Sequence, residues 1–178
     1  MSEGAAVLRE RLGIRRPRIA LVLGSGLGAL VDEVEGAVRV PYAEIPGFPR
    51  SAVSGHAGEV VAGTLSGVEV MVLSGRVHYY ESGAAGAMRP AFEMLGEIGV
   101  DTLVLTNAAG SVNEGIAPGS VMLIEDHINL TGRNPLIGEA SDRRFVGMTT
   151  AYDPALREAV VRAAERLGEP LGRGTYLW

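Results

Sequence analysis

Residues 75–81 gather several side chains that could bind an anion and a hydroxyl-rich ligand. The segment has the sequence Gly-Arg-Val-His-Tyr-Tyr-Glu and directly follows the apolar run at residues 68–73. The guanidinium of Arg76 matches two phosphate oxygens, and the imidazole of His78 can donate or accept a proton near neutral pH. Tyr80 adds an amphipathic ring that suits a sugar. Because ligands of open α/β sheets bind beyond the carboxyl ends of strands, we expect a binding site here, with a solvated surface loop as the alternative.

A second cluster, Gly-Ser-Gly-Leu-Gly at residues 24–28, follows the apolar run at 18–23. Glycines let backbone N–H groups approach an oxyanion, and Ser25 can donate its hydroxyl. The segment also fits the dinucleotide pattern G-x-G-x-x-[GA], but the acidic residue expected about 20 positions later would be Glu44, in a proline-rich loop. We therefore favour a phosphate loop, with a nicotinamide-binding domain or an empty strand-to-helix turn as alternatives.

A third cluster, Thr-Asn-Ala-Ala-Gly-Ser at residues 106–111, follows another apolar run. The Asn107 amide and the successive N–H groups of a small-residue turn form a donor-rich concavity, although a purely structural Asx-turn fits as well. His56 lies on a small-residue loop that could swing over the site, or it is a solvated loop histidine. Three donor-rich turns after three strands predict one oxyanion pocket.

Composition restricts the classes of function. The 178 residues fit one domain with enough apolar content, 47%, for a sizeable core. The net charge of -5 and the scattered basic residues argue against a nucleic-acid partner. The absence of cysteine excludes disulfides and thiolate metal sites, and the three histidines are too dispersed to indicate a metal. We expect no membrane span and no signal peptide, so the expected location is cytoplasmic.

The periodicity of the chain alternates between helices and strands, as in an α/β fold. The prolines at residues 41–49 predict a loop or isolated turns, and Ser66-Gly67 predicts a two-residue hairpin turn. We expect helices at 3–12, 29–34, 84–98 and 154–167, and strands at 18–23, 58–65, 68–73, 101–106 (buried) and 120–124.

Residues 174–178 have the composition of the first residues of a strand, and the sequence stops there at its single tryptophan. A domain seldom stops within a strand. We therefore expect the N-terminal part of a longer fold, or a chain from which some C-terminal residues are missing.

Four motifs occur in an order that resembles the trimeric purine nucleoside phosphorylases. They are residues 24–28, 75–81, 106–110 and 126–130, and the shorter segments 134–136 and 151–153 also fit. The resemblance covers essentially the whole chain. It implies a single nucleoside phosphorylase domain at residues 1–178, incomplete at its C-terminus, with a phosphorylase/hydrolase-like mixed twisted sheet flanked by helices and lacking its C-terminal elements.

The resemblance implies a pentosyltransferase of purine salvage. Purine nucleoside and orthophosphate would give free base and ribose 1-phosphate, usually with 6-oxopurines. No cofactor or metal is implied, because orthophosphate is a co-substrate. The implied assembly is a cytoplasmic homotrimer. Methylthioadenosine or adenosine phosphorylase stays open as an alternative, as does a catalytically impaired truncated paralogue that acts as a phosphate-binding or assembly module.

The family's site residues are carried over by matching motifs. The purine-binding glutamate, the asparagine that stabilises the departing base and a further histidine of the family would lie beyond Trp178, so a protein ending there is expected to have little or no activity. His78 and Asn107 are the expected catalytic residues. The implied phosphate-binding set is Ser25, Arg76, His78, Asn107, the N–H of Ala108 and His56, and the implied ribose-binding set is Tyr80 and Phe145 from the neighbouring subunit.

Overall fold

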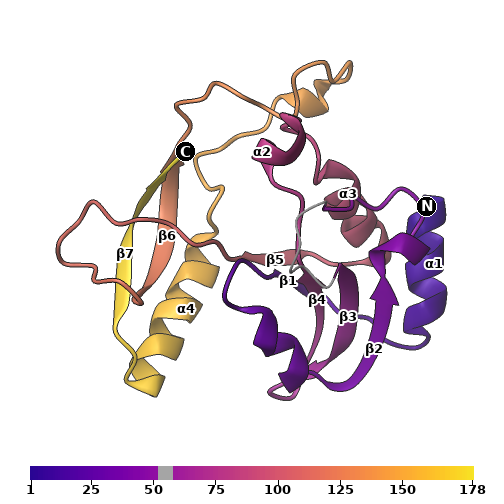
Figure 1. Cartoon of the computed structure of the whole chain (residues 1–178), viewed down its shortest axis with the longest axis horizontal. Coiled ribbons are helices and arrows are strands. Elements are labelled where there is room, and N and C mark those ends of the chain that lie inside the picture. The colour runs from indigo at the N-terminus through magenta and orange to yellow at the C-terminus, as the bar shows by residue number, and fades with distance from the viewer. Residues whose placement is uncertain (52–57) are drawn as a thin grey trace. The chain divides into compact units, whose positions relative to one another are not determined.

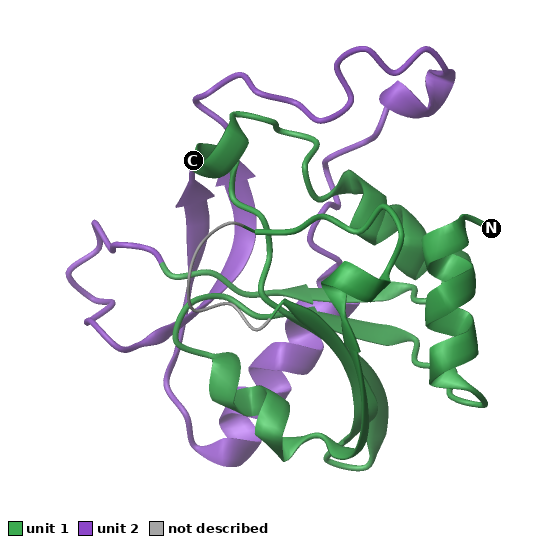
Figure 2. Cartoon of the chain, turned by 45° about the vertical axis from the view of Figure 1, so that its right-hand side comes forward, with its two compact units in different colours: residues 1–108 green, residues 109–178 purple. Residues whose placement is uncertain are grey.

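The computed structural model describes residues 1–51 and 58–178, which form two compact units. Figure 2 shows unit 1, Met1–Ala108, in green and unit 2, Ala109–Trp178, in purple. Figure 1 labels the elements. Unit 1 contains α1 (Glu3–Leu12), β1 (Ile19–Val22), the 3₁₀ helix η1 (Gly28–Glu33), β2 (Glu35–Pro41), the 3₁₀ helix η2 (Tyr42–Glu44), β3 (Glu59–Leu65), β4 (Val68–Ser74), α2 (Tyr79–Ser82), α3 (Arg89–Ile98) and β5 (Thr102–Leu105). Unit 2 contains β6 (Val121–Ile128), the 3₁₀ helix η3 (Asp142–Arg144), α4 (Pro154–Leu167) and β7 (Leu171–Leu177).

Unit 1 is built on a five-stranded sheet with the strand order β2-β3-β4-β1-β5. Strand β1 runs parallel to both of its neighbours, β4 and β5, whereas β3 runs antiparallel to β2 and β4. The sheet is therefore mixed and has helices packed against it, which confirms the fold class expected from the sequence.

The turn between β3 and β4 has the geometry that its two residues predict. Ser66 and Gly67 have φ angles of 50° and 80°. Positive φ at both central positions is the signature of a type I′ turn, whose twist matches that of the flanking strands. The predicted hairpin is confirmed, with Leu65 paired to Val68.

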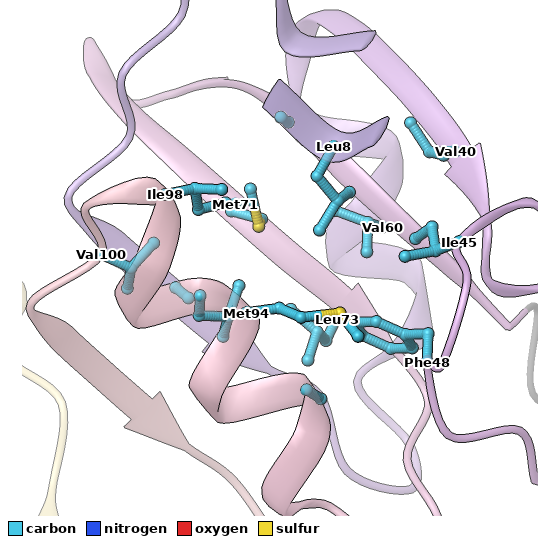
Figure 3. Close-up of a cluster of buried hydrophobic side chains, with 14 of the residues drawn as sticks. Leu8, Val40, Ile45, Phe48, Val60, Met71, Leu73, Met94, Ile98 and Val100 are labelled. Atoms are coloured by element: carbon cyan, nitrogen blue, oxygen red, sulfur yellow. The ribbon is translucent and has the colours of Figure 1, made fainter. Parts of the chain in front are cut away.

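One face of the sheet in unit 1 is covered by α1 and α3, as Figure 3 shows for the buried side chains. Leu8 of α1 and Met94 of α3 pack in the same cluster as Met71 and Leu73 of β4. Each of these side chains is at most 5% exposed. Fully burying such a side chain contributes about 1.5–3 kcal/mol, so this layer fixes the position of β4.

The opposite face of β4 is covered by η1. Val70 and Val72 alternate with the residues of the first cluster, because successive side chains of a strand point to opposite faces. They pack with Leu23, Val31 and Val34, all of which are buried. Both faces of β4 are thus apolar and covered, which is why its sequence is a continuous hydrophobic run.

The two helices with clear end signals form where the sequence predicts them. The Ser2 hydroxyl accepts a hydrogen bond from the N–H of Ala5 at the start of α1, and Asp153 accepts one from Leu156 at the start of α4. Such caps satisfy donors that have no partner within the helix. Helix α4 ends at Gly168, which adopts the left-handed conformation with φ 67°.

Two predicted helices differ from the structure. Helix α3 begins at Arg89 instead of residue 84, and residues 85–88 form turns. Pro90 explains the late start, because a proline has no N–H to donate and is tolerated in the first helical turn. The predicted helix at 29–34 is the 3₁₀ helix η1, one residue earlier.

The predicted strands also need correction. The expectation of a buried strand at 101–106 is wrong in its burial: β5 is an edge strand, with Val104 41% and Leu105 60% exposed. Strand β6 does not stop at residue 124 but continues to Ile128, because Asp126 and His127 still pair with β7 beyond a bulge. Strand β2 and the short helix α2 were not predicted from the sequence.

Unit 2 contains a small parallel sheet of β6 and β7, joined through α4. None of the side chains at residues 109–178 is buried. Its strands are held by backbone pairing and by ion pairs of Glu125 with Arg157 and Arg173. Among the residues that the structure describes in either unit, no helix is both long and apolar enough to span a membrane.

Tyr42 is expected to make unit 1 less stable at alkaline pH. Its ring is 4% exposed, and its hydroxyl donates a hydrogen bond of 2.7 Å to the carbonyl of Gly75. Burial, followed by the nearby carboxylate of Glu59, raises the pKa of Tyr42 above its ordinary value. Below the unfolded pKa of about 10 the phenol is neutral in both states; above it only the unfolded chain releases the proton, so stability falls as pH rises.

We expect Tyr42→Phe to lower the free energy of unfolding by about 1 kcal/mol at neutral pH, because the Gly75 carbonyl loses its partner. The loss of stability above about pH 10 should be shallower in the variant than in the parent chain. Urea unfolding at a series of pH values measures both effects. Parallel pH profiles for the two chains would show that Tyr42 does not produce the alkaline dependence.

Candidate functional site

Three strand ends of unit 1 meet at one edge of the sheet. Val22, the last residue of β1, is in register with Leu73 of β4 and Leu105 of β5. Because β1 is parallel to both neighbours, the segments that follow all three strands leave from the same edge (Figure 1). These segments are the three donor-rich clusters that the sequence analysis identified.

The glycine loop after β1 makes a tight turn against the end of β5. The Leu27 N–H donates to the Gly24 carbonyl at 3.2 Å, and Gly26 has a φ of 86°, so Ser25 lies at the exposed tip of the turn. Gly24 itself is buried and comes so near that a Cβ atom would lie 2.7 Å from the Thr106 carbonyl oxygen. Only glycine permits this approach between the two turns.

The Arg76 side chain donates a hydrogen bond to the Thr106 carbonyl, the group that lies against Gly24. It is partly buried, and its Nη1 donates to the Thr106 oxygen at 2.5 Å. A guanidinium carries five N–H donors in a planar fork, so one anchored nitrogen restricts the orientation of the whole group. The Arg76 loop, the glycine loop and the end of β5 are therefore in direct contact.

Asn107 and Ala108 follow Thr106 immediately and are both exposed. The Asn107 side-chain amide donates to the Ala108 carbonyl at 3.3 Å, which closes a small turn. Ser25 of the second cluster and Asn107 and Ala108 of the third, all predicted to bind phosphate, therefore lie within two positions in sequence of the Gly24 to Thr106 contact.

His78 is held at the start of α2 by an acidic residue. Its backbone N–H donates to Glu81 Oε1 at 2.7 Å, and its Nδ1 lies 3.2 Å from the same oxygen. The Ser51 hydroxyl donates to Glu81 Oε2 at 3.0 Å. The His78 ring also stacks on Tyr80, with 4.9 Å between ring centroids and 12° between planes. Tyr80 is 72% exposed, so its outer face is open to a ligand.

Glu81 is a site residue to which sequence reasoning gave no role. A polar residue followed three positions later by glutamate is the pattern of a capping box, and here His78 and Glu81 occupy those two positions. The pattern would have indicated the contact. The Glu81 carboxylate at Nδ1 restricts the plane of the imidazole ring.

Two further residues were predicted for the site, His56 and Phe145. His56 lies outside the described residues. Phe145 belongs to unit 2, where it is 73% exposed and the Arg144 guanidinium lies 4.9 Å from the centre of its ring. It borders a surface hollow of about 390 Å³ that Asn134 and Leu136 also line.

The turns after β1, β4 and β5 offer donors suited to an oxyanion. They are the Ser25 hydroxyl, the anchored Arg76 guanidinium, the Asn107 amide and the backbone N–H groups of the exposed turns. Charge-assisted bonds from such donors are the strongest that proteins make to phosphate or carboxylate. In the part of the chain that the structure describes, no three His, Cys, Asp or Glu side chains are grouped as metal ligands would be. The chemistry supported by this edge is anion binding next to an imidazole and an exposed tyrosine ring.

Comparisons with known proteins identify the family of the chain. The family model of the phosphorylase superfamily matches residues 18–178. The chain is 43% identical over 180 residues to purine nucleoside phosphorylase 1 of Geobacillus stearothermophilus. The aligned region covers 99% of this chain and 65% of that protein. It therefore spans about two thirds of that relative's length. The chain belongs to the phosphorylase superfamily.

Solved structures of the family have the same fold. A purine nucleoside phosphorylase in complex with ribose-1-phosphate superposes with a TM-score of 0.90 at 35% identity, over 98% of this chain and 67% of the other. The Schistosoma mansoni purine nucleoside phosphorylase in complex with inosine gives a TM-score of 0.88 at 34% identity, over 97% of this chain and 63% of the other.

The close approach at Gly24 gives a direct test of the site's construction. In Gly24→Ala the new Cβ would meet the backbone at the Thr106 oxygen and, at 3.1 Å, the Asn107 Cα. We expect unfolding free energy to fall by about 1–3 kcal/mol, because neither backbone atom can move without displacing a strand end. Chemical denaturation measures the change.

Gly28→Ala is the matched control. A Cβ at Gly28 meets nothing within 4 Å, and its φ is not in the left-handed region. We expect a change within about 0.5 kcal/mol. Equal stabilities of the two variants would contradict the tight contact between the glycine loop and β5.

Proposed function

We propose that this chain carries the phosphate-binding and ribose-binding part of a purine nucleoside phosphorylase. The proposed reaction is the phosphorolysis of 6-oxopurine nucleosides to free base and ribose 1-phosphate. The observation that carries the proposal is the contact of Gly24 and Arg76 with the same residue, Thr106. That contact gathers the three donor-rich turns at one place.

Phosphate is assigned to the donors at the sheet edge of unit 1. Ser25 and the glycine loop would bind it from one side, Arg76 from another, and the Asn107 amide with the Ala108 N–H from a third. His78, oriented by Glu81, would donate to a phosphate oxygen. We assign His56 to the same anion as a proposal from the sequence alone.

Ribose is assigned to the tyrosine next to the phosphate donors. Tyr80 is exposed and stacked on His78, so a sugar that lies on its ring would be adjacent to a phosphate held by His78. We also propose a cytoplasmic homotrimer, in which Phe145 reaches the ribose of a neighbouring copy. The 73% exposure of Phe145 leaves the ring available to another chain.

The proposed mechanism needs no protein nucleophile. An oxygen of phosphate forms a bond to the anomeric carbon while the bond from that carbon to the purine nitrogen breaks. The electron pair leaves with the purine, which takes up a proton. Catalysis is then mainly positioning of the anion beneath the sugar and electrostatic stabilisation of the developing ribosyl cation. No redox or metal step is proposed.

Arg76→Ala tests the proposal at its charged donor. We expect phosphate affinity, measured by calorimetry, to fall by about tenfold to a hundredfold, because a charge-assisted bond contributes about 1.5–3 kcal/mol. Arg18→Ala is the control, since Arg18 precedes β1 at the opposite edge of the sheet and pairs with Asp101 on the surface. Its phosphate affinity should be unchanged.

The reaction class is tested by a separate incubation of the parent chain with inosine. Incubation with phosphate should yield hypoxanthine and ribose 1-phosphate, and no base should be released in phosphate-free buffer. The identity of the product decides the class, whatever the rate. Free ribose as the product, or phosphate affinity equal in Arg76→Ala and the parent chain, would contradict the proposal.

A further inference from the structure

Thr106 is the residue at which the three turns of the site are joined. Its backbone N–H donates to the Val22 carbonyl at 3.1 Å, and its hydroxyl donates to the same oxygen at 3.0 Å. The hydroxyl oxygen accepts the N–H of Gly24 at 2.7 Å. The backbone oxygen accepts Arg76 Nη1 at 2.5 Å. One residue therefore contacts the end of β1, the glycine loop and the Arg76 side chain.

The hydroxyl of Thr106 has no proton left for a ligand. A threonine hydroxyl carries one proton, and a carbonyl oxygen such as that of Val22 can only accept. The proton is therefore directed at Val22, and a lone pair is occupied by the Gly24 N–H. Any effect of this hydroxyl on an anion has to act through the groups that it holds in place.

The groups that the Thr106 hydroxyl contacts determine the orientation of the residues proposed to bind phosphate. Gly24 immediately precedes Ser25, so the bond to its N–H fixes the starting point of the glycine turn. Gly24 is buried, and without the hydroxyl its N–H would lose the acceptor that it has in the structure. A buried N–H without a partner is strongly disfavoured, so the turn would move to find another acceptor.

The threonine side chain suits this position because it is branched. A branched side chain has few χ1 rotamers available, and this limits where the hydroxyl can point. Serine would keep the two hydrogen bonds with a freer rotamer, whereas valine would keep the shape and lose both bonds. The two substitutions therefore separate the hydroxyl from the packing of the side chain.

We propose that Thr106 is a positioning residue for phosphate binding: its hydroxyl and carbonyl hold the glycine loop and Arg76 in the relative geometry that an oxyanion requires. This inference rests on the proposed function for the identity of the anion. It adds a residue that does not touch the ligand and whose effect on affinity is indirect.

The experiment compares Thr106→Val and Thr106→Ser in the full chain by calorimetry with inorganic phosphate. We expect about tenfold weaker phosphate binding in the valine variant and a change within about threefold in the serine variant. Hydrogen exchange of the Gly24 amide should become faster with valine and stay near the parent rate with serine. Thermal melts identify the temperature range in which all variants are folded.

Thr102→Val is the matched control. Thr102 lies at the other end of β5, where its hydroxyl donates to the side chain of Asp101, so its loss should leave phosphate affinity unchanged. A valine variant of Thr106 that melts earlier but binds phosphate as the folded parent does would overturn the proposal, since its role would then be structural only. Equal losses of affinity in the serine and valine variants would also overturn it.

Failure of the proposed function is distinguishable from failure of this inference. If the chain binds phosphate but releases free ribose from inosine, the proposed reaction fails, and Thr106 is still judged by the phosphate affinities of its variants. If the parent chain does not bind phosphate, the positioning role and the phosphate site are both overturned.

Discussion

The site depends on one constraint, the parallel pairing of β1 with a neighbour on each side. Parallel strands end at the same edge, so the segments after β1, β4 and β5 start next to one another although they are far apart in sequence. Gly24 then allows the backbones of two of these segments to touch, because it has no Cβ. The remaining features of unit 1 hold these three ends in place: the two apolar layers on β4 and the anchored Arg76.

The same edge shows how a carboxylate can lie close to a predicted anion site. Glu81 is turned toward the His78 backbone and ring and toward Ser51, and its side chain is only 9% exposed. Its carboxylate is therefore engaged with His78 and Ser51. The arrangement supplies an imidazole held by a carboxylate, with an exposed tyrosine ring stacked on it.

Local sequence signals predicted those elements that local physics determines. The Ser66-Gly67 turn, helices α1 and α4 and the apolar runs of β1 and β4 all have causes within a few residues. By contrast, β2 was missed because its alternation is interrupted at a bulge between Glu35 and Val38. Strand β5 is exposed because it is the outermost strand of its sheet. The role of Thr106 depends on Gly24, which is 82 residues away in the sequence. The motif residues could be predicted, Thr106 among them, but the contacts by which Thr106 joins the three motifs could not.

The most direct test of the central claim, that three strand ends form one anion site, is a phosphate titration followed by the backbone amide signals of the chain. We expect the amide signals of Ser25, Arg76 and Ala108 to shift together and to fit one dissociation constant, while amide signals at the opposite ends of these strands, such as that of Thr102, do not shift. Shifts that fit separate constants, or that are confined to one of the three turns, would contradict it.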